Sequence, residues 1–437
     1  MIFNSSKYNT EWNTKRLSDL GKFQRGKSRH RPRNDSKLFE HGTYPLVQTG
    51  EVKAANLYIR THEACYNDFG LSQSAIWPEN TLCITIAANI AETALLGYPM
   101  CFPDSVVGFN AYPEESSELF MHYVFTYIRK AIQNSASGSI QDNINIEYLT
   151  GLRFKIPHKT YQDKIAEILS SLDKKIELNN RINAELEAMA KTLYEYWFVQ
   201  FDFPDANGKP YKASGGKMVY NDTLKREIPQ DWKVNKLVEI TSLIRRGISP
   251  KYTEESGTQV LNQKCIRNQK ISFEDSRRHQ AIMDDNDERL LKPFDVLVNS
   301  TGVGTLGRVA YVKRLAEKKT TVDSHVSIVR ANPDKVCPRY LAWKLMRYQP
   351  VIEAAANGST GQVELSKSFL EDLDVIIPSG SVAKKFSEFV EPIAISVAKR
   401  ESENEQLISL RDWLLPMLMN GQVTVKPSTE PQEAQHG

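Results

Sequence analysis

The feature that most constrains the fold is a heptad repeat in the stretch from Tyr161 to Phe198. Alternating steps of three and four residues select one line of side chains, which is the seam that a helix presents to a partner helix. Because no Pro or Gly interrupts this stretch, it predicts a coiled-coil helix of roughly 57 Å. The seam residues are Ile165, Leu169, Leu172, Ile176, Asn179, Asn183, Leu186, Ala190, Leu193 and Trp197.

The partner helix is predicted in the same chain, because the seam recurs 221 residues later. Thr160 is expected to cap the first helix and Ser381 the second. Pro392 lies well inside the second helix, so we expect a kink or a restart there. The second seam consists of Phe386, Val390, Ile393, Val397, Arg400, Asn404, Leu407, Arg411, Leu414 and Leu418.

The repeat extends beyond the helices. Trp12 corresponds to Trp232, and the pair Arg25-Gly26 corresponds to Arg246-Gly247. Gly138-Ser139 matches Gly358-Ser359, and Ile156-Pro157 matches Ile377-Pro378 just ahead of each helix. The chain is therefore expected to be two copies of one unit, a globular module followed by a long helix.

These patterns predict an α+β protein, in which two repeated α/β modules are joined by two long helices packed as an antiparallel coiled coil with pseudo-twofold symmetry. Asn183 and Asn404 lie at equivalent seam positions, where buried amides would fix register; a solvent-facing middle of the seam would give the same pattern. The expected segments are a first module at 1–158, a helix at 159–198, a linker at 199–227, a second module at 228–378, a helix at 379–419 and a disordered tail at 420–437.

Within the modules, short apolar runs such as YPLVQTG, TLCITIA and VVGFNAYP indicate strands, since Gly, Pro and Asn interrupt them regularly. Residues 118–134 share an apolar face at helical spacing, and residues 338–357 are their counterpart in the second module.

The composition, with 41% hydrophobic and 25% charged residues, is that of a soluble globular protein. The start lacks the features of a signal peptide, and no apolar run is long enough to span a membrane. The five cysteines are scattered and never in CxxC spacing, so we expect buried thiols in a reducing cytoplasm and neither a zinc site nor a disulfide framework.

Known catalytic motifs are missing from the sequence. Gly302, Gly304 and Gly307 satisfy GxGxxG, but the following RVAYV favours a glycine-rich turn between strands over a dinucleotide site. The sequence also lacks a P-loop, HExxH, GxSxG and the catalytic tetrapeptide of amino-methyltransferases. We therefore expect a chain with no catalytic activity, metal or cofactor of its own.

The segments LEAMAKTLYEYWFVQFDFPDANGKPYKASGG and REIPQDWKVNKL, together with the duplicated module ending in Ile-Pro, resemble the specificity (S) subunits of type I DNA restriction-modification systems. This resemblance implies two target-recognition domains, each reading one half of a bipartite, asymmetric DNA site, with the helices setting the spacer. It also implies two methyltransferase subunits on the helices and, in the full complex, translocase and nuclease subunits. S-adenosylmethionine, ATP and Mg would be bound by those partners.

DNA contacts are expected from polar side chains in repeat-equivalent loops, because Arg and Lys suit phosphates and guanine while Gln and Asn suit adenine. The stretch Lys22 to Arg33 is rich in Lys and Arg and has no acid, although a solvated basic loop would have the same composition. The candidates are Arg25, Lys27, Arg29, Arg31, Gln48, Thr49, Ser139 and Gln141 in the first module and Arg245, Arg246, Asn262, Lys264, Thr301, His325, Thr360 and Gln362 in the second.

The apolar seam positions are the candidates for helix and subunit contacts, namely Leu172, Ile176, Leu186, Leu193, Trp197, Ile393, Val397, Leu407, Leu414 and Leu418. Two other functions stay open on this sequence. One is a stand-alone DNA-modifying enzyme, and the other is an adaptor whose modules bind proteins. Steep weakening of binding by salt would favour DNA as the ligand.

Overall fold

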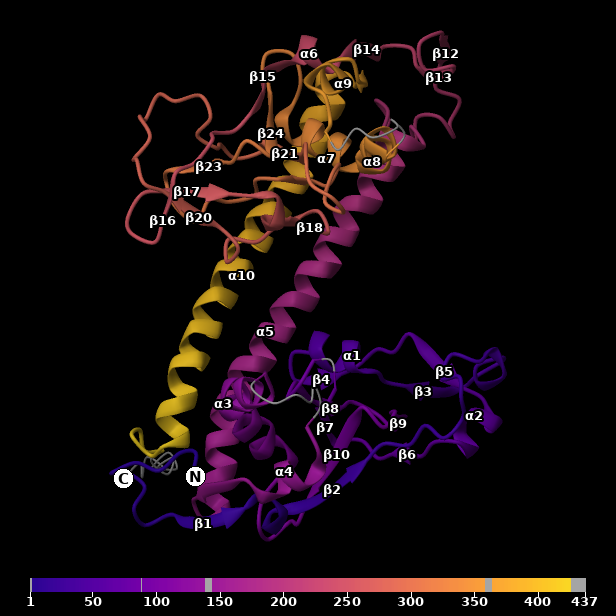
Figure 1. The fold of residues 1–437 in the computed structure, drawn as a ribbon. Helices are drawn as coiled ribbons and strands as arrows, with labels where there is room; N and C mark the ends of the chain where they lie inside the picture. Colours follow the sequence, from indigo (N-terminus) through magenta and orange to yellow (C-terminus); the bar gives the residue numbers. More distant parts are fainter. Residues whose placement is uncertain (1, 88, 138–143, 358–363, 426–437) are drawn as a thin grey trace, which may run out of the picture. The chain divides into compact units, whose positions relative to one another are not determined.

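The computed structural model describes residues 2–87, 89–137, 144–357 and 364–425 (Figure 1). The chain divides into two compact units: unit 1 is Met1–Arg181 with Glu401–Gly437, and unit 2 is Ile182–Arg400. The two long helices are α5 (Lys159–Tyr194) and α10 (Gly380–Met419). Each unit therefore contains one module, the first part of one long helix and the last part of the other.

Unit 1 is built on a five-stranded and a four-stranded sheet and on one further strand pair. Its helices are α1 (Thr49–Ala54), α2 (Asp68–Ser72), α3 (Glu118–Ser137) and α4 (Ile146–Gly151). Its strands are β1 (Asn13–Arg16), β2 (Gly21–Arg25), β3 (Tyr44–Leu46), β4 (Tyr58–Ile59), β5 (Ala64–Tyr66), β6 (Ile76–Trp77), β7 (Leu82–Thr85), β8 (Thr93–Leu96), β9 (Met100–Cys101), β10 (Val106–Ala111) and β11 (Arg153–Ile156).

The five-stranded sheet has the order β2-β10-β7-β8-β4, and the four-stranded sheet has the order β5-β3-β9-β6. The residues of β7 and β8 are all buried, so these two strands lie wholly within the core. α3 packs on β7, β8 and β10, and β1 pairs antiparallel with β11. The predicted strands in YPLVQTG, TLCITIA and VVGFNAYP are confirmed, as is the helix beginning at Glu118.

Unit 2 has the helices α6 (Leu237–Ile240), α7 (Pro338–Arg347), α8 (Gln349–Asn357) and α9 (Lys367–Glu371). Its strands are β12 (Met218–Asn221), β13 (Arg226–Pro229), β14 (Lys233–Lys236), β15 (Thr241–Arg246), β16 (Tyr252–Thr253), β17 (Thr258–Leu261), β18 (Ile266–Arg267), β19 (Lys270–Ile271), β20 (Arg277–His279), β21 (Val296–Asn299), β22 (Val309–Tyr311), β23 (Thr320–Val322), β24 (Val326–Ala331) and β25 (Asp374–Ile377).

The two modules repeat one topology. The order β2-β10-β7-β8 in unit 1 is matched by β15-β24-β21-β22 in unit 2, and the pair β1-β11 is matched by β14-β25. Each second sheet also contains one parallel pair, β3 with β9 and β17 with β23. The predicted duplication is therefore confirmed in the fold of each unit.

Within unit 1, α5 and α10 pack antiparallel. Asp173 of α5 contacts Arg411 of α10, while Asn179, further along α5, contacts Asn404, which comes earlier in α10. The predicted antiparallel helix pair is thus confirmed in this unit. The pseudo-twofold relation between the units stays a prediction.

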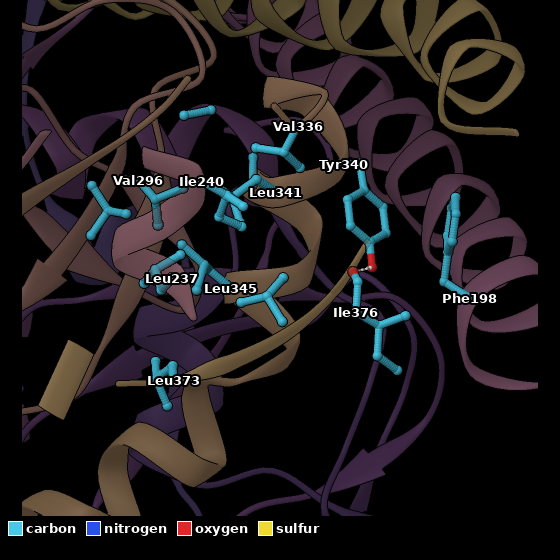
Figure 2. Close-up of a cluster of buried hydrophobic side chains, with 14 of the residues drawn as sticks. Phe198, Leu237, Ile240, Val296, Val336, Tyr340, Leu341, Leu345, Leu373 and Ile376 are labelled. Carbon is cyan, nitrogen blue, oxygen red and sulfur yellow. Dashed lines mark hydrogen bonds between the residues drawn. The ribbon is translucent and has the colours of Figure 1, made fainter. Parts of the chain in front are cut away.

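The core of unit 2 joins the module to its helix segments through aromatic rings (Figure 2). Tyr340 of α7 lies beside Phe198 in this view, and its hydroxyl donates a hydrogen bond of 2.6 Å to the carbonyl oxygen of Ile376. Phe198 belongs to a π-helical turn, Glu195–Val199, that follows α5. The C-terminal end of α5 is therefore part of the second module's core.

Of the kink or restart expected at Pro392 in the second long helix, the restart is contradicted, and the kink stays a prediction. α10 is continuous through this residue, so no restart occurs. Pro392 cannot donate the helical hydrogen bond to the carbonyl of Glu388, but neither residue is buried, so that water can solvate the free carbonyl. The helices also begin at Lys159 and Gly380, so Thr160 and Ser381 lie within the first turns and are not the caps.

Residues 338–357 form two helices instead of one, because Pro350 has no N–H to continue the ladder after α7. The carbonyl of Met346, which lacks its partner four residues on at this break, accepts a hydrogen bond of 3.1 Å from the side-chain amide of Gln269.

The predicted linker 199–227 is instead packed into unit 2. Phe201 and Phe203 are buried in its core, and Phe203 stacks on Tyr211 and Trp232. β12 and β13 form an antiparallel hairpin across the end of the same segment. The aromatic residues supply apolar surface for packing. The overall polar composition of the segment had led to the prediction of a linker.

The predicted tail 420–437 is ordered at its beginning. Val423 and Val425 pack against the core of unit 1, and the N–H of Val425 donates to the hydroxyl of Tyr161. Residues 426–437 lie outside the described part of the chain. Among the helices in the described ranges, none combines the length and the apolar character needed to cross a membrane.

Candidate nucleic-acid interface

An open cleft in unit 2 gathers several of the predicted DNA-binding residues. It lies where β15 and β21 end and where α9 begins, so polar loop residues surround a sheet edge. Of the predicted residues, Arg245, Arg246, Thr301 and His325 line it. The complete lining is Ser242, Leu243, Ile244, Arg245, Arg246, Gln263, Glu288, Thr301, Gly302, His325, Ser327, Glu364, Ser366 and Lys367.

The two arginines of the cleft are held by acidic partners. Arg245 forms an ion pair with Glu288, and Arg246 forms one with Glu364. Arg246 also donates a hydrogen bond of 3.1 Å to the carbonyl of Leu365, which fixes its guanidinium beside α9. Both pairs are substantially exposed to solvent, so anionic ligands such as phosphates can compete for the arginines.

A second polar pair lies at the same edge. The hydroxyl of Thr301 and Nδ1 of His325 are hydrogen-bonded, and the carbonyl of His325 accepts from the N–H of Ser300. The neighbouring Asp323 is buried, and burial raises its pKa; its carboxylate accepts from the N–H of His325. These bonds orient His325, whose side chain is exposed.

The position of Arg246 depends on the glycine that follows it. A Cβ at Gly247 would lie 1.9 Å from the carbonyl oxygen of Val322, at the end of β23. The equivalent Gly26 in unit 1 would place a Cβ 2.3 Å from the carbonyl oxygen of Pro103. The Arg-Gly pair is therefore repeated because both modules bring the ends of two strands into backbone contact.

In unit 1, none of the predicted residues Arg25, Lys27, Arg29 and Arg31 is buried. Arg25 ends β2 and donates a hydrogen bond of 2.6 Å to the carbonyl of Asp104. The Asp104 carboxylate pairs with Arg33 at 2.6 Å and with Arg31 at 3.4 Å. Three arginines of the basic stretch thus gather around one acidic residue just after β9, close to the Gly26 contact.

A histidine side chain also stabilises the conformation of the basic loop. His30 lies 2.8 Å from the Asp35 carboxylate. This hydrogen bond, followed by one from the backbone of Lys37, lowers the pKa of Asp35. The ring of His30 packs edge-on against Phe69.

The polar residues that follow β3 and β17 act as helix caps. Gln48 precedes α1, which begins at Thr49, and the N–H of Gln48 donates to the carboxylate of Glu51. Asn262 precedes a short 3-10 helix; its Oδ1 accepts from the N–H of Lys264 and its amide donates to the carbonyl of Asp275. Asn262 therefore uses its side chain inside the module, which makes it a weaker candidate for base contact.

Four predicted DNA-binding residues lie outside the described residues, namely Ser139, Gln141, Thr360 and Gln362. Gln263, Glu288, Glu364 and Lys367 line the cleft but were missed from the sequence. Gln263 is adjacent to the predicted Asn262, whereas the acidic residues carry no sequence signal of their own. The side-chain Oε1 of Gln263 is buried without a hydrogen-bond partner among the described residues.

The candidate contact residues of the helices are distributed over both units. Ile176, Val397 and Leu418 are almost fully buried. Leu193, Trp197 and Ile393 pack against the core of unit 2, and Leu414 packs against the core of unit 1. Leu172, Leu186 and Leu407 are partly buried.

The amide layer of the seam is buried, as the first of its two interpretations predicted. Asn179 donates to Oδ1 of Asn404 at 2.9 Å and to Glu403 at 2.8 Å, and Asn404 donates to Oδ1 of Asn180 at 2.9 Å. Asn183 is buried in unit 2, where its Oδ1 has no partner among the described residues. The seam middle of unit 1 is thus a buried amide network rather than a solvent-facing gap.

The surfaces described above present cationic and hydrogen-bonding groups. The cleft combines cations with hydrogen-bonding side chains at a sheet edge, which suits phosphates and base edges. Within the described ranges, no three His, Cys, Asp or Glu side chains converge as a possible metal site. The five cysteines are free thiols; Cys83, Cys101 and Cys265 are buried, and Cys65 and Cys337 are partly buried.

Comparisons with known proteins agree with this arrangement. Residues 9–188 match the family model of the type I restriction modification DNA specificity domain. The chain is 23% identical over 430 residues to the type I restriction enzyme MjaIX specificity subunit of Methanocaldococcus jannaschii, covering 95% of this chain and 94% of that protein. It is 23% identical over 452 residues to the HindI specificity subunit of Haemophilus influenzae, covering 90% of this chain and 97% of that protein.

The fold is also similar to a solved structure. The crystal structure of the S subunit of a type I restriction-modification system from M. genitalium matches 96% of this chain and 99% of its own, with a TM-score of 0.59 and 17% sequence identity. Residues 9–188 therefore match the type I restriction modification DNA specificity domain, and nearly the whole chain is similar to type I restriction enzyme specificity subunits.

Proposed function

We propose that this chain is the DNA sequence-specificity subunit of a type I restriction-modification complex, in which each module reads one half of a bipartite, asymmetric site. One observation carries the proposal: the same fold occurs twice, with an Arg-Gly turn in both copies and different polar side chains around it. Two copies of one reader with unlike contact residues recognise unlike half-sites. Residues 1–158 and 228–378 would be the target-recognition domains.

Electrostatics support DNA as the ligand. Arg25, Lys27, Arg29 and Arg31 are accessible on one loop of unit 1, and Arg245 is exposed at the cleft of unit 2. The acidic partners of Arg31 and Arg245 lie close to or on the surface, so phosphates can replace them at little cost. Counterion release then makes binding steeply dependent on salt.

The helices supply two equivalent docking places for modification subunits. Met189 of α5 and Leu410 of α10 are 221 residues apart, and their side chains are 54% and 43% exposed. Because an exposed apolar side chain recurs at the repeat spacing, two copies of one methyltransferase subunit would bind there.

In this proposal the chain is a non-catalytic subunit. S-adenosylmethionine, ATP and Mg are bound by the methyltransferase and the restriction or translocase subunits, and the complex works on DNA in the cytoplasm. The segments 159–198 and 379–419 would set the length of the unread spacer.

The test is a methylation map of DNA modified by this chain in complex with its modification subunits. Arg246→Ala should weaken or relax recognition of one half-site only, because Arg246 belongs to one of the two modules. The expected loss is about 1 to 3 kcal/mol, the contribution of one base contact. Arg25→Ala should affect the other half-site only. Lys335→Ala is the matched control, since Lys335 is an exposed cation of unit 2 that does not line the cleft.

Three results would contradict the proposal. If either variant changed the recognition of both half-sites equally, the arrangement of two separate readers would be contradicted. Binding that does not weaken as salt rises would favour a protein adaptor. Methylation or cleavage of DNA by the purified chain alone would identify an enzyme.

A further inference from the structure

A buried ion pair joins the two long helices in unit 1. Nη1 of Arg411 lies 2.7 Å from Oδ1 of Asp173, and the hydroxyl of Tyr123 donates a hydrogen bond of 2.6 Å to Oδ2 of the same carboxylate. The Asp173 side chain is 2% exposed. One cation and one hydroxyl group therefore compensate a carboxylate that has almost no access to water.

The repeat does not preserve this pair. Adding 221 to Asp173 gives Ala394, and subtracting 221 from Arg411 gives Ala190. Ala190 is fully buried in the core of unit 2. The N-terminal half thus carries Asp173 and Ala190 at the two positions. The C-terminal half carries Ala394 and Arg411 at the equivalent positions.

This asymmetry determines which helix suits which partner. If two N-terminal halves paired with each other, Ala190 of one copy would take the place of Arg411 and leave Asp173 of the other without a cation. If two C-terminal halves paired, Ala394 would take the place of Asp173. Arg411 would then keep only the exposed carboxylate of Asp412, so this self-pair would be penalised less. Either self-paired complex would contain two such sites by symmetry.

The neighbouring amide layer does not discriminate in the same way. In a pair of N-terminal halves, Asn183 would occupy the place of Asn404 and could form the same hydrogen bonds with Asn179 and Asn180 of the other copy. In a pair of C-terminal halves, Arg400 and Glu401 would stand in place of Asn179 and Asn180, so the amides would be lost there. The charges are thus the feature that discriminates against a pair of N-terminal halves.

We propose that the Asp173–Arg411 pair makes the two halves of this chain associate with each other and rejects association of either half with itself. A lone buried charge weakens a complex by about two orders of magnitude or more. The cognate pair should therefore exceed the self-pairs at least ~100-fold. The device would preserve a subunit with two unlike readers against exchange with other copies.

The test keeps the complete chain and cuts it once after folding. A site for a specific protease is inserted in the exposed turn at Asn207 and Gly208, the folded chain is cleaved, and both fragments are left to equilibrate before native mass spectrometry. We expect the cognate pair to dominate. Asp173→Ala combined with Arg411→Ala should reduce its excess at least ~10-fold, because no lone charge then opposes self-pairing.

Two further variants keep the test decisive. Asp173→Ala alone should increase self-pairs of the N-terminal half, since the introduced alanine then suits Ala190 while Arg411 loses its partner. Lys175→Ala is the control, because the Lys175–Glu403 pair on the same helices is exposed and should not alter the ratio. A statistical mixture of pairs from the unmutated chain, or an unchanged excess in the double variant, would overturn the proposal.

Discussion

In the two units, the module contacts the long helices through different kinds of side chain. In unit 1, Tyr123 of α3 contacts the helix pair through the carboxylate of Asp173, which in turn pairs with Arg411. In unit 2, the equivalent residue of α7 is Trp343, which stacks on Tyr194 at the end of α5. Aromatic packing gives stability from buried area, whereas a buried ion pair gives little net stability but penalises a wrong partner. The duplicated fold thus retained its topology while its two junctions diverged.

The largest effect is expected in the aromatic junction of unit 2. Phe198 is 3% exposed, and its ring centroid lies 4.7 Å from that of Tyr340 and 4.9 Å from that of Phe386. Phe198→Ala should lower the free energy of unfolding by about 4 kcal/mol, because it removes buried area and leaves a cavity. Chemical denaturation with hydrogen exchange resolved by peptide would locate the loss in unit 2.

Tyr196→Ala is the control for this variant, since Tyr196 lies on the same helical turn but is 38% exposed. Its effect should stay within about 0.5 kcal/mol. If Phe198→Ala loosened unit 1 as much as unit 2, the aromatic cluster would not be a local junction.

The polar junction of unit 1 should be less sensitive but strongly coupled. Arg411→Ala should cost about 3 kcal/mol, because it leaves the Asp173 carboxylate buried without a cation. Adding Asp173→Ala should restore part of that loss, since the pair then becomes as apolar as Ala190 and Ala394 in the repeat. Urea unfolding of the two single variants and the double variant measures the coupling; strictly additive losses would show that the charges do not interact.

The units should also differ in their response to acid. Burial, followed by the charges of Arg129 and Arg411, lowers the pKa of His122 in α3 to about 3. The same residue has a pKa of about 6.5 when unfolded, so below that pH the unfolded chain binds a proton that the folded chain does not. The free energy of unfolding should therefore fall by about 1.4 kcal/mol per pH unit, or about 2 kcal/mol at pH 5.

The equivalent position in unit 2 is Ala342, so this contribution is specific to unit 1. His122→Asn should flatten the decline between pH 7 and pH 5 relative to the unmutated chain, as measured by urea unfolding at each pH. Equal slopes in the two proteins would mean that His122 becomes protonated in the folded state.

Periodicity and repetition were enough to predict the architecture. The seam from Ile165 to Trp197 recurred at 221 residues, and a helix of that length with a narrow apolar seam requires a partner. The prediction failed where tertiary packing overrides local composition. Phe201 and Phe203 lie in a segment rich in Gly, Pro and Lys, and they become core residues only because Trp232 and Tyr211 lie beside them.

The candidate interface was less accessible from sequence. The repeated Arg-Gly pair identified Arg25 and Arg246 because a glycine with a fixed backbone contact leaves a local pattern. Glu288 and Glu364 left none, since they reach the cleft from loops distant in sequence and their partners are set by the fold. Asn262 had the residue type of a base reader, but its hydrogen bonds to the backbone show it to be a cap.

The smallest effect is expected from the exposed ion pair on the helices of unit 1. Nζ of Lys175 lies 3.5 Å from Glu403, and the two side chains are 46% and 43% exposed. Water and salt screen this pair, and Glu403 also accepts a hydrogen bond from Asn179, so Lys175→Ala should change the free energy of unfolding by less than about 0.5 kcal/mol. Comparing the unfolding free energies of Lys175→Ala and Arg411→Ala compares two ion pairs across the same two helices. The Lys175–Glu403 pair is exposed, whereas Arg411 pairs with the buried Asp173. If both variants cost the same, burial would not set the strength of the Asp173–Arg411 pair, and the difference between the two junctions would lose its physical basis.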